Sequence, residues 1–448
     1  MLKEKNNTIV ALSTPLGVGA ICIVRMSGND AITIADKIFR NLKGKTPSEF
    51  EARKLELGIL TTDNFKEQIL CVVFRAPFSF TGENLVEFQC HGGIKIAEGV
   101  ISACLNNGAT MASNGEFSKR AFINGKLSLD KAEGMMDMIN AESDAEIRAG
   151  FNLLEGDLGK LATNAQLQLT DLISEIEVSF DYPEEDIEYI TKSNAKQKLN
   201  DILINLDNVI ATSSAGKQIT SGISLLILGE PNVGKSSLLN ALTKSNRAIV
   251  TDIAGTTRDT IEAPLEINGV KFKLIDTAGI HETEDIVERL GIEKAKEEIK
   301  SADLCLVMVD ASKEINDKDK KVLSLTEKNN RIIIGNKIDL TQTPKQFADI
   351  FISTTNTKDI ENLKQIIYKK TASNLITNGL IITNLRHLDA LKRARKHIAN
   401  AVSAIDTETL DLISIDLNLA YSALGEITGS TTGEDIIDAI FSKFCLGK

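Results

Sequence analysis

The sequence predicts a multi-domain α/β protein in which a helical domain is interrupted by an inserted, doubly wound α/β domain. With 448 residues, the chain is long enough for about three domains. Short apolar runs between Gly-rich turns fill the first 120 residues, and two helix-rich regions flank a segment in which apolar strands and helical patterns alternate. We therefore expect an α+β domain over 1–120, a first helical part over 121–215, the inserted domain over 216–375 and a second helical part over 376–448.

The first two regions differ in their apolar periodicity. Apolar runs predict strands at 19–26, 69–74 and 85–88, and helical spacing predicts a helix at 94–105. From residue 121 the Gly and Pro content falls, and leucines recur at helical spacing, as in Leu154, Leu158 and Leu161. These long helices should break near Pro183, and the small polar residues 211–217 predict a linker.

The inserted region carries four continuous apolar runs, at 223–228, 272–275, 304–309 and 331–335. Such runs are typical of parallel strands that are buried on both faces. After residue 378 the helical pattern returns, and Thr431 and Glu434 have the spacing of a capping box. The helix that follows should present an apolar face made of Ile436, Ile437, Ile440, Phe441 and Phe444.

Composition excludes several classes of protein. The net charge of −11 argues against a general binder of nucleic acid backbones, so any RNA contact should be local. The six cysteines are scattered without a Cys-x-x-Cys pair, which indicates neither a disulfide framework nor a zinc site. No apolar stretch is long enough to span a bilayer and the amino terminus is polar, so we expect a cytosolic protein with no membrane partner.

Residues 229–236 form a complete Walker A pattern between a predicted strand and a predicted helix. Glycines at this spacing let backbone N–H groups surround phosphate oxygens at a helix N-terminus. Lys235 should reach the β and γ phosphates, and the Ser236 hydroxyl should bind Mg²⁺. The nucleotide contacts predicted here are Asn232, Val233, Gly234, Lys235, Ser236 and Ser237.

Two further motifs follow later strands. Asp276, Thr277, Ala278 and Gly279 form an Asp-x-x-Gly turn that can hold the Mg²⁺ shell and sense a γ-phosphate. Asn336, Lys337 and Asp339 belong to an Asn-Lys-x-Asp motif, whose carboxylate can accept from both the ring N–H and the amino group of guanine. Because all three motifs follow strands of one predicted sheet, the sequence predicts a guanine nucleotide site.

A polar segment between the first two motifs is predicted to be a switch loop. It comprises Thr251, Asp252, Ile253, Ala254, Gly255, Thr256 and Thr257, with Thr257 as the second Mg²⁺ ligand. Arg258 could act as an arginine finger, although an ordinary salt-bridged or solvated arginine is favoured. Ile280 stands where many small GTPases have a water-orienting Gln, so another group must orient the attacking water.

The segments 234–240, 252–259, 287–291 and 444–448 together resemble the tRNA uridine-5-carboxymethylaminomethyl modification GTPase family, MnmE (TrmE). The resemblance extends from Thr8 to Lys448. It implies an amino-terminal tetrahydrofolate-binding domain that dimerises, a discontinuous helical domain and an inserted P-loop GTPase (Ras-like) domain. One departure is the loop Ser353, Thr354 and Thr355, which should contact guanine but lacks the usual Ser-Ala pair.

The resemblance also implies site residues. The folate site would use Arg25, Glu87, Lys126 and Lys448. A potassium ion would be held by Asn232, Thr251, Ile253 and Thr256, and Glu288 would orient the attacking water. The resemblance implies a catalytic role for Cys445, and burial as a structural thiol is the alternative.

The function implied is that of a homodimeric, K⁺-stimulated GTPase that needs GTP and Mg²⁺. With the flavoprotein MnmG, it would modify carbon 5 of the wobble uridine, position 34, in certain tRNAs. The aminomethyl or carboxymethylaminomethyl group would come from a 5-formyl- or methylene-tetrahydrofolate donor. The alternative is a regulatory GTPase that binds the ribosome or an effector and modifies nothing, although the sequence lacks a recognisable separate RNA-binding module.

Overall fold

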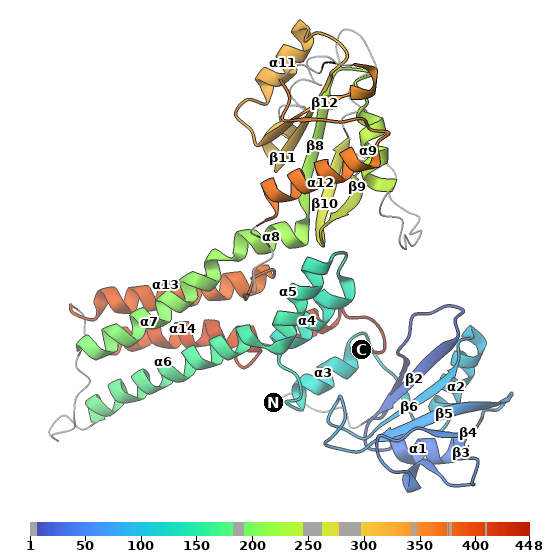
Figure 1. The fold of residues 1–448 in the computed structure, drawn as a ribbon. Coiled ribbons are helices and arrows are strands. Elements are labelled where there is room, and N and C mark those ends of the chain that lie inside the picture. The colour runs from blue at the N-terminus through green and yellow to red at the C-terminus, as the bar shows by residue number, and fades with distance from the viewer. Residues whose placement is uncertain are drawn as a thin grey trace, which may run out of the picture. The chain divides into compact units, whose positions relative to one another are not determined.

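The computed structural model describes residues 7–181, 192–244, 262–276, 297–341, 343, 347–373, 375, 379–407 and 410–448 (Figure 1). The chain divides into two compact units, each made of separate stretches of sequence. The first unit comprises Met1–Met136, Leu153–Leu203 and Ala390–Lys448, and the second comprises Asp137–Asn152 and Ile204–Asp389. The fold is multi-domain α/β with separate mixed sheets, as the sequence predicts.

The first unit contains a seven-stranded sheet of order β3-β4-β5-β6-β2-β1-β7, antiparallel except for the β1–β7 pair. Its strands are β1 (Ile9–Leu12), β2 (Ile21–Ser27), β3 (Phe39–Asn41), β4 (Glu56–Thr61), β5 (Lys66–Phe74), β6 (Leu85–His91) and β7 (Thr110–Met111). Helices α1 (Ala31–Ile38) and α2 (Ile94–Asn106) pack on this sheet, and a 3₁₀ turn, η1 (Pro47–Glu49), follows β3. Four buried thiols, Cys22, Cys71, Cys90 and Cys104, lie in the core between them.

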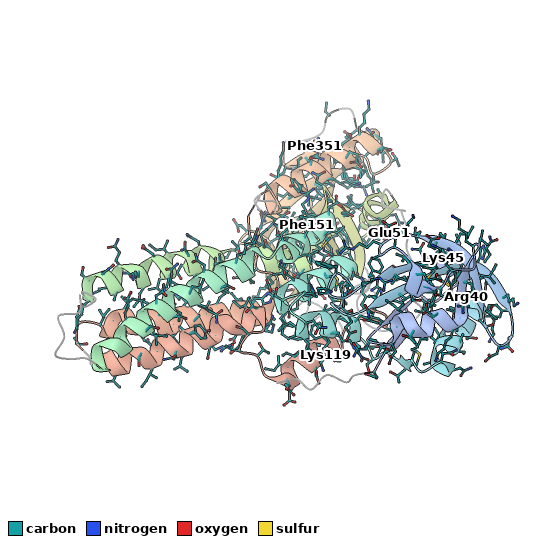
Figure 2. The ribbon with its side chains drawn as sticks, turned by 90° about the horizontal axis from the view of Figure 1, so that it is seen from below. Arg40, Lys45, Glu51, Lys119, Phe151 and Phe351 are labelled. Atoms are coloured by element: carbon teal, nitrogen blue, oxygen red, sulfur yellow. The ribbon has the colours of Figure 1, made fainter. Side chains whose placement is uncertain are left out.

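Helices dominate the rest of this unit. The bounds are α3 (Glu116–Ile123), α4 (Leu129–Asn140), α5 (Asp144–Glu155), α6 (Asp157–Asp181), α7 (Lys192–Ala211), α13 (Leu385–Ala404), α14 (Leu410–Thr428) and α15 (Glu434–Phe441), with parts of α4, α5, α7 and α13 assigned to the second unit. The four long helices α6, α7, α13 and α14 run side by side (Figures 1 and 2). The buried Gln166 of α6 donates to the carbonyl of Tyr421 on α14, at 3.0 Å, so its polar group is satisfied inside the bundle.

The second unit contains a six-stranded sheet of order β13-β12-β11-β8-β10-β9, parallel except for the β9–β10 hairpin. Its strands are β8 (Ile223–Gly229), β9 (Glu262–Ile267), β10 (Val270–Asp276), β11 (Leu304–Asp310), β12 (Arg331–Asn336) and β13 (Ile350–Phe351). The helices described are α8 (Ser213–Ser221), α9 (Lys235–Lys244), α11 (Asp317–Leu325) and α12 (Thr357–Thr371), with the 3₁₀ turn η3 (Ile338–Leu340).

Alternate residues of the central strands serve the two faces of this sheet. Leu225 and Ile227 of β8 pack with α9 and α12, whereas Leu226 and Leu228 pack on the side of α11. Burial on both faces explains why the strands read as continuous apolar runs in the sequence. The helices therefore cover both faces, as in a doubly wound α/β fold.

Two local predictions are wrong. Residues 211–217 are not a linker, because α7 continues to Ala211 and α8 begins at Ser213. Helix α8 is held by packing, since Ile219 is buried in the core of the second unit and a Cβ atom on Gly216 would lie 1.8 Å from the carbonyl oxygen of Ile382. Small polar residues are weak helix formers in isolation, so this contact overrides the local preference.

The predicted capping box is also wrong, because Gly433 caps α15 without a side-chain hydrogen bond. The Thr431 hydroxyl instead donates to the carbonyl of Ser422 at 2.7 Å, which ties the turn to α14. The apolar face is confirmed in part: Ile437, Phe441 and Phe444 are buried, whereas Ile436 is half exposed.

Candidate functional site

The Walker A segment lies at the carboxyl end of β8, the strand between β10 and β11, and leads into α9. Asn232 and Gly234 adopt positive φ angles of 67° and 104°, which turn the backbone around the start of the helix. The Lys235 ammonium group donates to the carbonyls of Gly229 and Glu230, at 2.7 and 2.9 Å, and so lies over the loop. Ser236 and Ser237 are exposed in the first turn of α9. Exposed N–H groups at a helix N-terminus together with a nearby ammonium group suit a phosphate and its Mg²⁺ ion.

Asn336 joins this loop to the end of β12. Its side chain is 1% exposed, and its amide Nδ2 donates to the carbonyl of Val233 at 2.8 Å. Its Oδ1 accepts from the N–H of Thr354 at 3.3 Å. A Cβ atom on Gly234 would lie 2.3 Å from the Asn336 amide nitrogen, so this close approach requires glycine. One buried amide thus links three segments that carry predicted nucleotide contacts.

The other members of the guanine motif lie near Asn336. Lys337 adopts a left-handed backbone, φ 66°, and donates to Asp310 at 2.8 Å. Asp339 is exposed in η3. Ser353 is buried; its N–H donates to Asp359 at 2.8 Å, and its hydroxyl lies 2.8 Å from that of Thr355. The exposed carboxylate of Asp339 is therefore available to a base that lies against Lys337 and Thr354.

Sequence reasoning missed Asp310, which ends β11 between β8 and β12. Burial alone would raise the pKa of this carboxyl, but hydrogen bonds from Lys337 and Ser312 outweigh burial and lower it. The side chain is thus a carboxylate that fixes the Lys337 ammonium group. The signal that could have revealed Asp310 in the sequence is its position directly after an apolar run, which it shares with Asp276.

Part of the predicted site falls outside the described residues. These positions are Thr251, Asp252, Ile253, Ala254, Gly255, Thr256, Thr257, Arg258, Thr277, Ala278, Gly279, Ile280 and Glu288. Asp276 is described as the last residue of β10, where it pairs with Ile227 of β8. The starts of all three motifs therefore lie at the carboxyl edge of one sheet, where α/β folds bind ligands.

The first unit brings together the residues predicted to bind folate. Arg25 of β2 forms an ion pair with Glu87 of β6 at 2.8 Å, and both side chains are largely buried. The Arg25 guanidinium lies 5.7 Å from the centre of the Phe80 ring and 5.9 Å from that of Phe117. The aromatic rings offer a flat apolar surface and the ion-paired guanidinium offers a charge. This combination suits a pterin ring and its acidic tail.

Lys126 lies next to the loop that carries Phe80, and Lys448 comes from the carboxyl-terminal tail. The Lys126 side chain passes Gly82, where a Cβ atom would lie 3.2 Å from its Cε. Burial, and in addition the charge of Arg25, lowers the pKa of Lys448, while Cys445 acts in the opposite direction. The lysine thus lies within electrostatic reach of Arg25, although the two are more than 400 residues apart in the sequence.

The carboxyl-terminal tail is docked on the amino-terminal domain. The N–H of Gly115 donates to the carbonyl of Cys445 at 3.4 Å, and the Ser13 hydroxyl donates to that of Gly447 at 3.2 Å. Cys445 is exposed, so the alternative of a buried structural thiol is wrong, whereas the other five cysteines are buried. A thiol on the surface beside a lysine is accessible for chemistry.

Three features define the chain as a P-loop GTPase. They are the P-loop after the central strand β8, the Asn-Lys-x-Asp motif at the same edge of the sheet, and the strand order of the second unit. Family models match two parts of it: "GTP-binding protein TrmE N-terminus" over residues 8–126 and "MnmE helical domain" over residues 129–445. The chain is 40% identical over 458 residues to the tRNA modification GTPase MnmE of Bacillus subtilis, covering 99% of this chain and all of the relative. It is 41% identical over 456 residues to MnmE of Lactobacillus gasseri, covering 99% and 98%. The chain belongs to the MnmE family of tRNA modification GTPases.

Solved structures resemble the chain over a smaller part. Era of Aquifex aeolicus bound to GDP and AlF4⁻ is 28% identical, with a TM-score of 0.27, and covers 39% of this chain and 66% of that one. The G domain of the Thermotoga maritima FeoB iron transporter is 24% identical, with a TM-score of 0.26, and covers 33% and 98%. Within the described part of the chain, no helix is both long and apolar enough to cross a membrane.

Proposed function

We propose that this chain is a K⁺-stimulated GTPase that acts with the flavoprotein MnmG on carbon 5 of uridine 34 in certain tRNAs. The group added is aminomethyl or carboxymethylaminomethyl, and a 5-formyl- or methylene-tetrahydrofolate supplies the one-carbon unit. The observation that carries the proposal is a second polar site, separate from the P-loop, in which the Arg25–Glu87 ion pair lies within electrostatic reach of Lys448, in the tail that also carries the exposed Cys445. A purely regulatory GTPase has no need for such a site.

In the nucleotide site, Lys235 neutralises phosphate charge, and Ser236 with Thr257 holds Mg²⁺. Asp339 accepts from the guanine edge, and Asn336 holds the loops around the base. The support is the position of Lys235 over the loop and the bridge from Asn336 to Val233. Asp276, with Thr277 to Gly279, senses the γ-phosphate.

A potassium ion replaces the missing arginine finger. Asn232, Thr251, Ile253 and Thr256 would hold it, and Glu288 would orient water in place of Ile280. A monovalent cation near the β and γ phosphates offsets charge that develops during phosphoryl transfer. The exposed Asn232, with its left-handed backbone in the phosphate loop, is the described residue that supports this assignment.

In the folate site, Arg25, Lys126 and Lys448 bind the anionic and carbonyl groups, and Glu87 accepts from the pterin N–H donors. Cys445 lies in the tail that carries Lys448, and we assign it a catalytic role at the donor or the uridine. The site would be completed by a second copy of the chain, which makes the protein a homodimer. The tRNA substrate places the work of the enzyme in the cytoplasm.

The test is mass spectrometry of tRNA nucleosides from cells that lack this protein and are complemented with variants. Wild type and Lys443→Ala should restore the carbon-5 group on uridine 34, whereas Lys448→Ala and Cys445→Ser should not. Lys443 is a matched control, because it is an exposed lysine in the same tail. An unchanged nucleoside profile in cells without the protein would favour the regulatory GTPase instead.

A further inference from the structure

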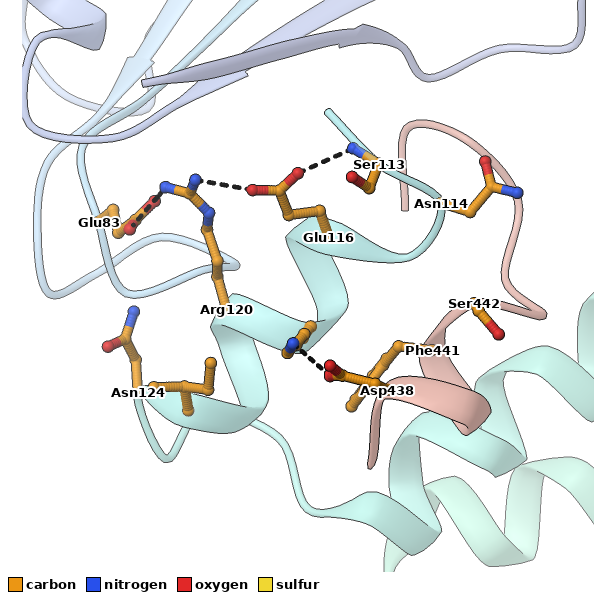
Figure 3. Close-up of a pocket in the computed structure, with 11 residues that line it drawn as sticks. Glu83, Ser113, Asn114, Glu116, Arg120, Asn124, Asp438, Phe441 and Ser442 are labelled. Carbon is orange, nitrogen blue, oxygen red and sulfur yellow. Dashed lines mark hydrogen bonds and ion pairs between the residues drawn. The ribbon is translucent and has the colours of Figure 1, made fainter. Parts of the chain in front are cut away.

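A pocket of about 350 Å³ lies between α3, α15 and the loop before β6 (Figure 3). Two consecutive cations of α3, Lys119 and Arg120, line the pocket and pair with different segments. Arg120 forms an ion pair with Glu83 in the loop before β6, and Lys119 forms an ion pair with Asp438 of α15 (Figure 3). The charges of the pocket are therefore paired across its walls, which indicates a joint between segments and not a site for a charged ligand.

Arg120 holds three segments that are distant in the sequence. Its side chain is 10% exposed and donates to the carbonyl and side chain of Asn7, at 2.9 and 3.1 Å. It also donates to Glu83 at 3.1 Å and to Glu116 at 2.8 Å. A buried guanidinium whose donors are directed at acceptor atoms on three residues fixes the geometry of all three residues, because leaving any acceptor unpaired costs free energy.

A chain of hydrogen bonds runs from Glu83 to the proposed folate site. Glu83 accepts from the Ser27 hydroxyl at 2.6 Å, and that hydroxyl lies 2.7 Å from the hydroxyl of Thr81. Ser27 is two residues beyond Arg25 on β2, so the two side chains lie on the same face of the sheet. The Thr81 carbonyl in turn accepts from Asn124 at 2.7 Å, two residues before Lys126. The loop that carries Phe80 is thus held next to both Arg25 and Lys126.

Lys119 contacts the helix that leads into the carboxyl-terminal tail, the other part of the proposed folate site. It forms an ion pair with Asp438 of α15, the helix that leads into the carboxyl-terminal tail. Packing supports the same contact, since a Cβ atom on Gly115 would lie 2.2 Å from the carbonyl oxygen of Phe441. The tail then runs to β1, where a Cβ atom on Gly447 would lie 2.2 Å from the carbonyl oxygen of Leu12. The ion pair therefore sets where the tail begins its path to Lys448.

We propose that Lys119 and Arg120 are positioning residues of the proposed folate site. In the loop half of this proposal, Arg120 acts through Glu83 to fix the loop that carries Phe80. In the tail half, Lys119 acts through Asp438 to fix the tail that carries Cys445 and Lys448. Neither residue touches the donor. The inference rests on the proposed function for its ligand, but the docking of the tail is a property of this chain alone.

The tail half is tested by a spin label on Cys445, the exposed cysteine among the described residues. The wild-type line shape should be dominated by an immobilised component. Lys119→Met and Asp438→Asn should each add a mobile component, whereas the conservative Lys119→Arg and the charge swap Lys119→Asp with Asp438→Lys should restore the immobilised one. Lys443→Met, in the same tail, is the control and should change nothing. Equal line shapes in wild type and Lys119→Met would overturn this half.

The loop half is tested with 5-formyltetrahydrofolate as the probe, by calorimetry on the full chain. Glu83→Ala and Arg120→Lys should raise its dissociation constant about tenfold, the scale of one lost charge-assisted hydrogen bond, while the rate of GTP hydrolysis stays unchanged. The thermal unfolding midpoint, measured on the same samples, reports whether each variant is folded.

The outcomes separate the two proposals. If Arg25→Ala abolishes binding of the probe but folded Glu83→Ala and Arg120→Lys bind normally, the positioning role is wrong and the proposed folate site stands. If wild type does not bind the probe, the proposed folate site fails, and the loop half fails with it. The spin-label result then still decides whether Lys119 docks the tail.

Discussion

At the scale of single residues, burial decides what each polar group can do. Asn336 is buried and has a partner for both its nitrogen and its oxygen, through Val233 and Thr354. Asp130 of α4 is equally buried, yet among the described residues neither of its carboxylate oxygens has a hydrogen-bond partner. The first residue organises a site, whereas the second leaves an unsatisfied polar group in the core.

We expect the cost of Gly159→Ala to depend on Asp130. A Cβ atom on Gly159 would lie 2.6 Å from Asp130 Oδ2, so the substitution should destabilise the wild type by about 2 kcal/mol. In an Asp130→Ala background the clash is gone, and the better helix propensity of Ala should make the same change stabilising by about 0.5 kcal/mol. A double-mutant cycle by urea unfolding measures the coupling, and equal costs in both backgrounds would contradict the clash.

Buried thiols predict a loss of stability at alkaline pH. Burial raises the pKa of Cys104 to about 12, from a usual value of 9.0, and raises those of Cys71 and Cys90 as well. Below pH 9 the thiols are protonated in both states and contribute nothing. Above pH 9 only the unfolded chain loses the proton, so each thiol should lower the free energy of unfolding by up to about 1.4 kcal/mol per pH unit.

The measurement is the unfolding free energy between pH 8 and 10.5, compared with Cys104→Ala. The variant should be less stable at pH 8 because it lacks the buried sulfur atom. Its free energy of unfolding should fall less steeply with pH than that of the wild type, because one fewer buried thiol titrates on unfolding. Identical slopes would show that Cys104 does not titrate with unfolding.

At the scale of elements, α5 precedes the inserted domain in the sequence yet helps to build the core of the second unit. Ala145 of α5 lies in the same core as Leu265 and Phe272, and its N–H donates to the carbonyl of Gly269 at 2.8 Å. Gly269 turns the β9–β10 hairpin, and a Cβ atom there would lie 3.0 Å from that of Asp144. Helix α5 is thus joined to the hairpin between the predicted switch loop and the Asp-x-x-Gly motif.

Lys271 should be the main charge at this joint. Its ammonium lies 2.5 Å from Glu142 and 3.7 Å from Glu146, and the side chains of Lys271 and Glu146 are mostly buried. Lys271→Met should therefore destabilise the second unit by about 1–2 kcal/mol, because Glu146 loses its cation. Lys320→Met removes an ion pair that is exposed on α11 and should change stability by less than about 0.5 kcal/mol. Equal thermal shifts for the two variants would argue against a role for the buried pair.

At the scale of the whole molecule, each proposed site draws on distant segments of one chain. The proposed folate site draws on β2, β6, the segment that includes and follows α3, and the tail, and the described part of the proposed nucleotide site draws on the loops after β8, β12 and β13. The proposed potassium ion predicts that GTP hydrolysis is at least about tenfold faster in KCl than in NaCl at equal ionic strength, since Ile280 supplies no hydrogen bond to water. Asn232→Ala should remove the difference between the salts while leaving the slow basal rate, and equal wild-type rates would exclude the cation.

The sequence by itself determined the central strands of the second unit and the order of the motifs. The four apolar runs of the inserted region fall within one or two residues of β8, β10, β11 and β12, because strands buried on both faces must be apolar throughout. The P-loop was equally plain, because phosphate binding restricts residue type at nearly every position.

Only the tertiary structure decided the features that depend on long-range contacts. Residues 213–217 belong to α8 because Gly216 and Ile219 pack against distant segments, and Cys445 is exposed because its backbone, and not its thiol, is held by Gly115. Arg120 has the sequence context of an ordinary helical arginine, yet it bonds to Asn7 and Glu83, which lie 113 and 37 residues away. The physical reason is that local periodicity encodes which face of an element is buried, whereas the partners of a buried charge are set by how the chain closes on itself.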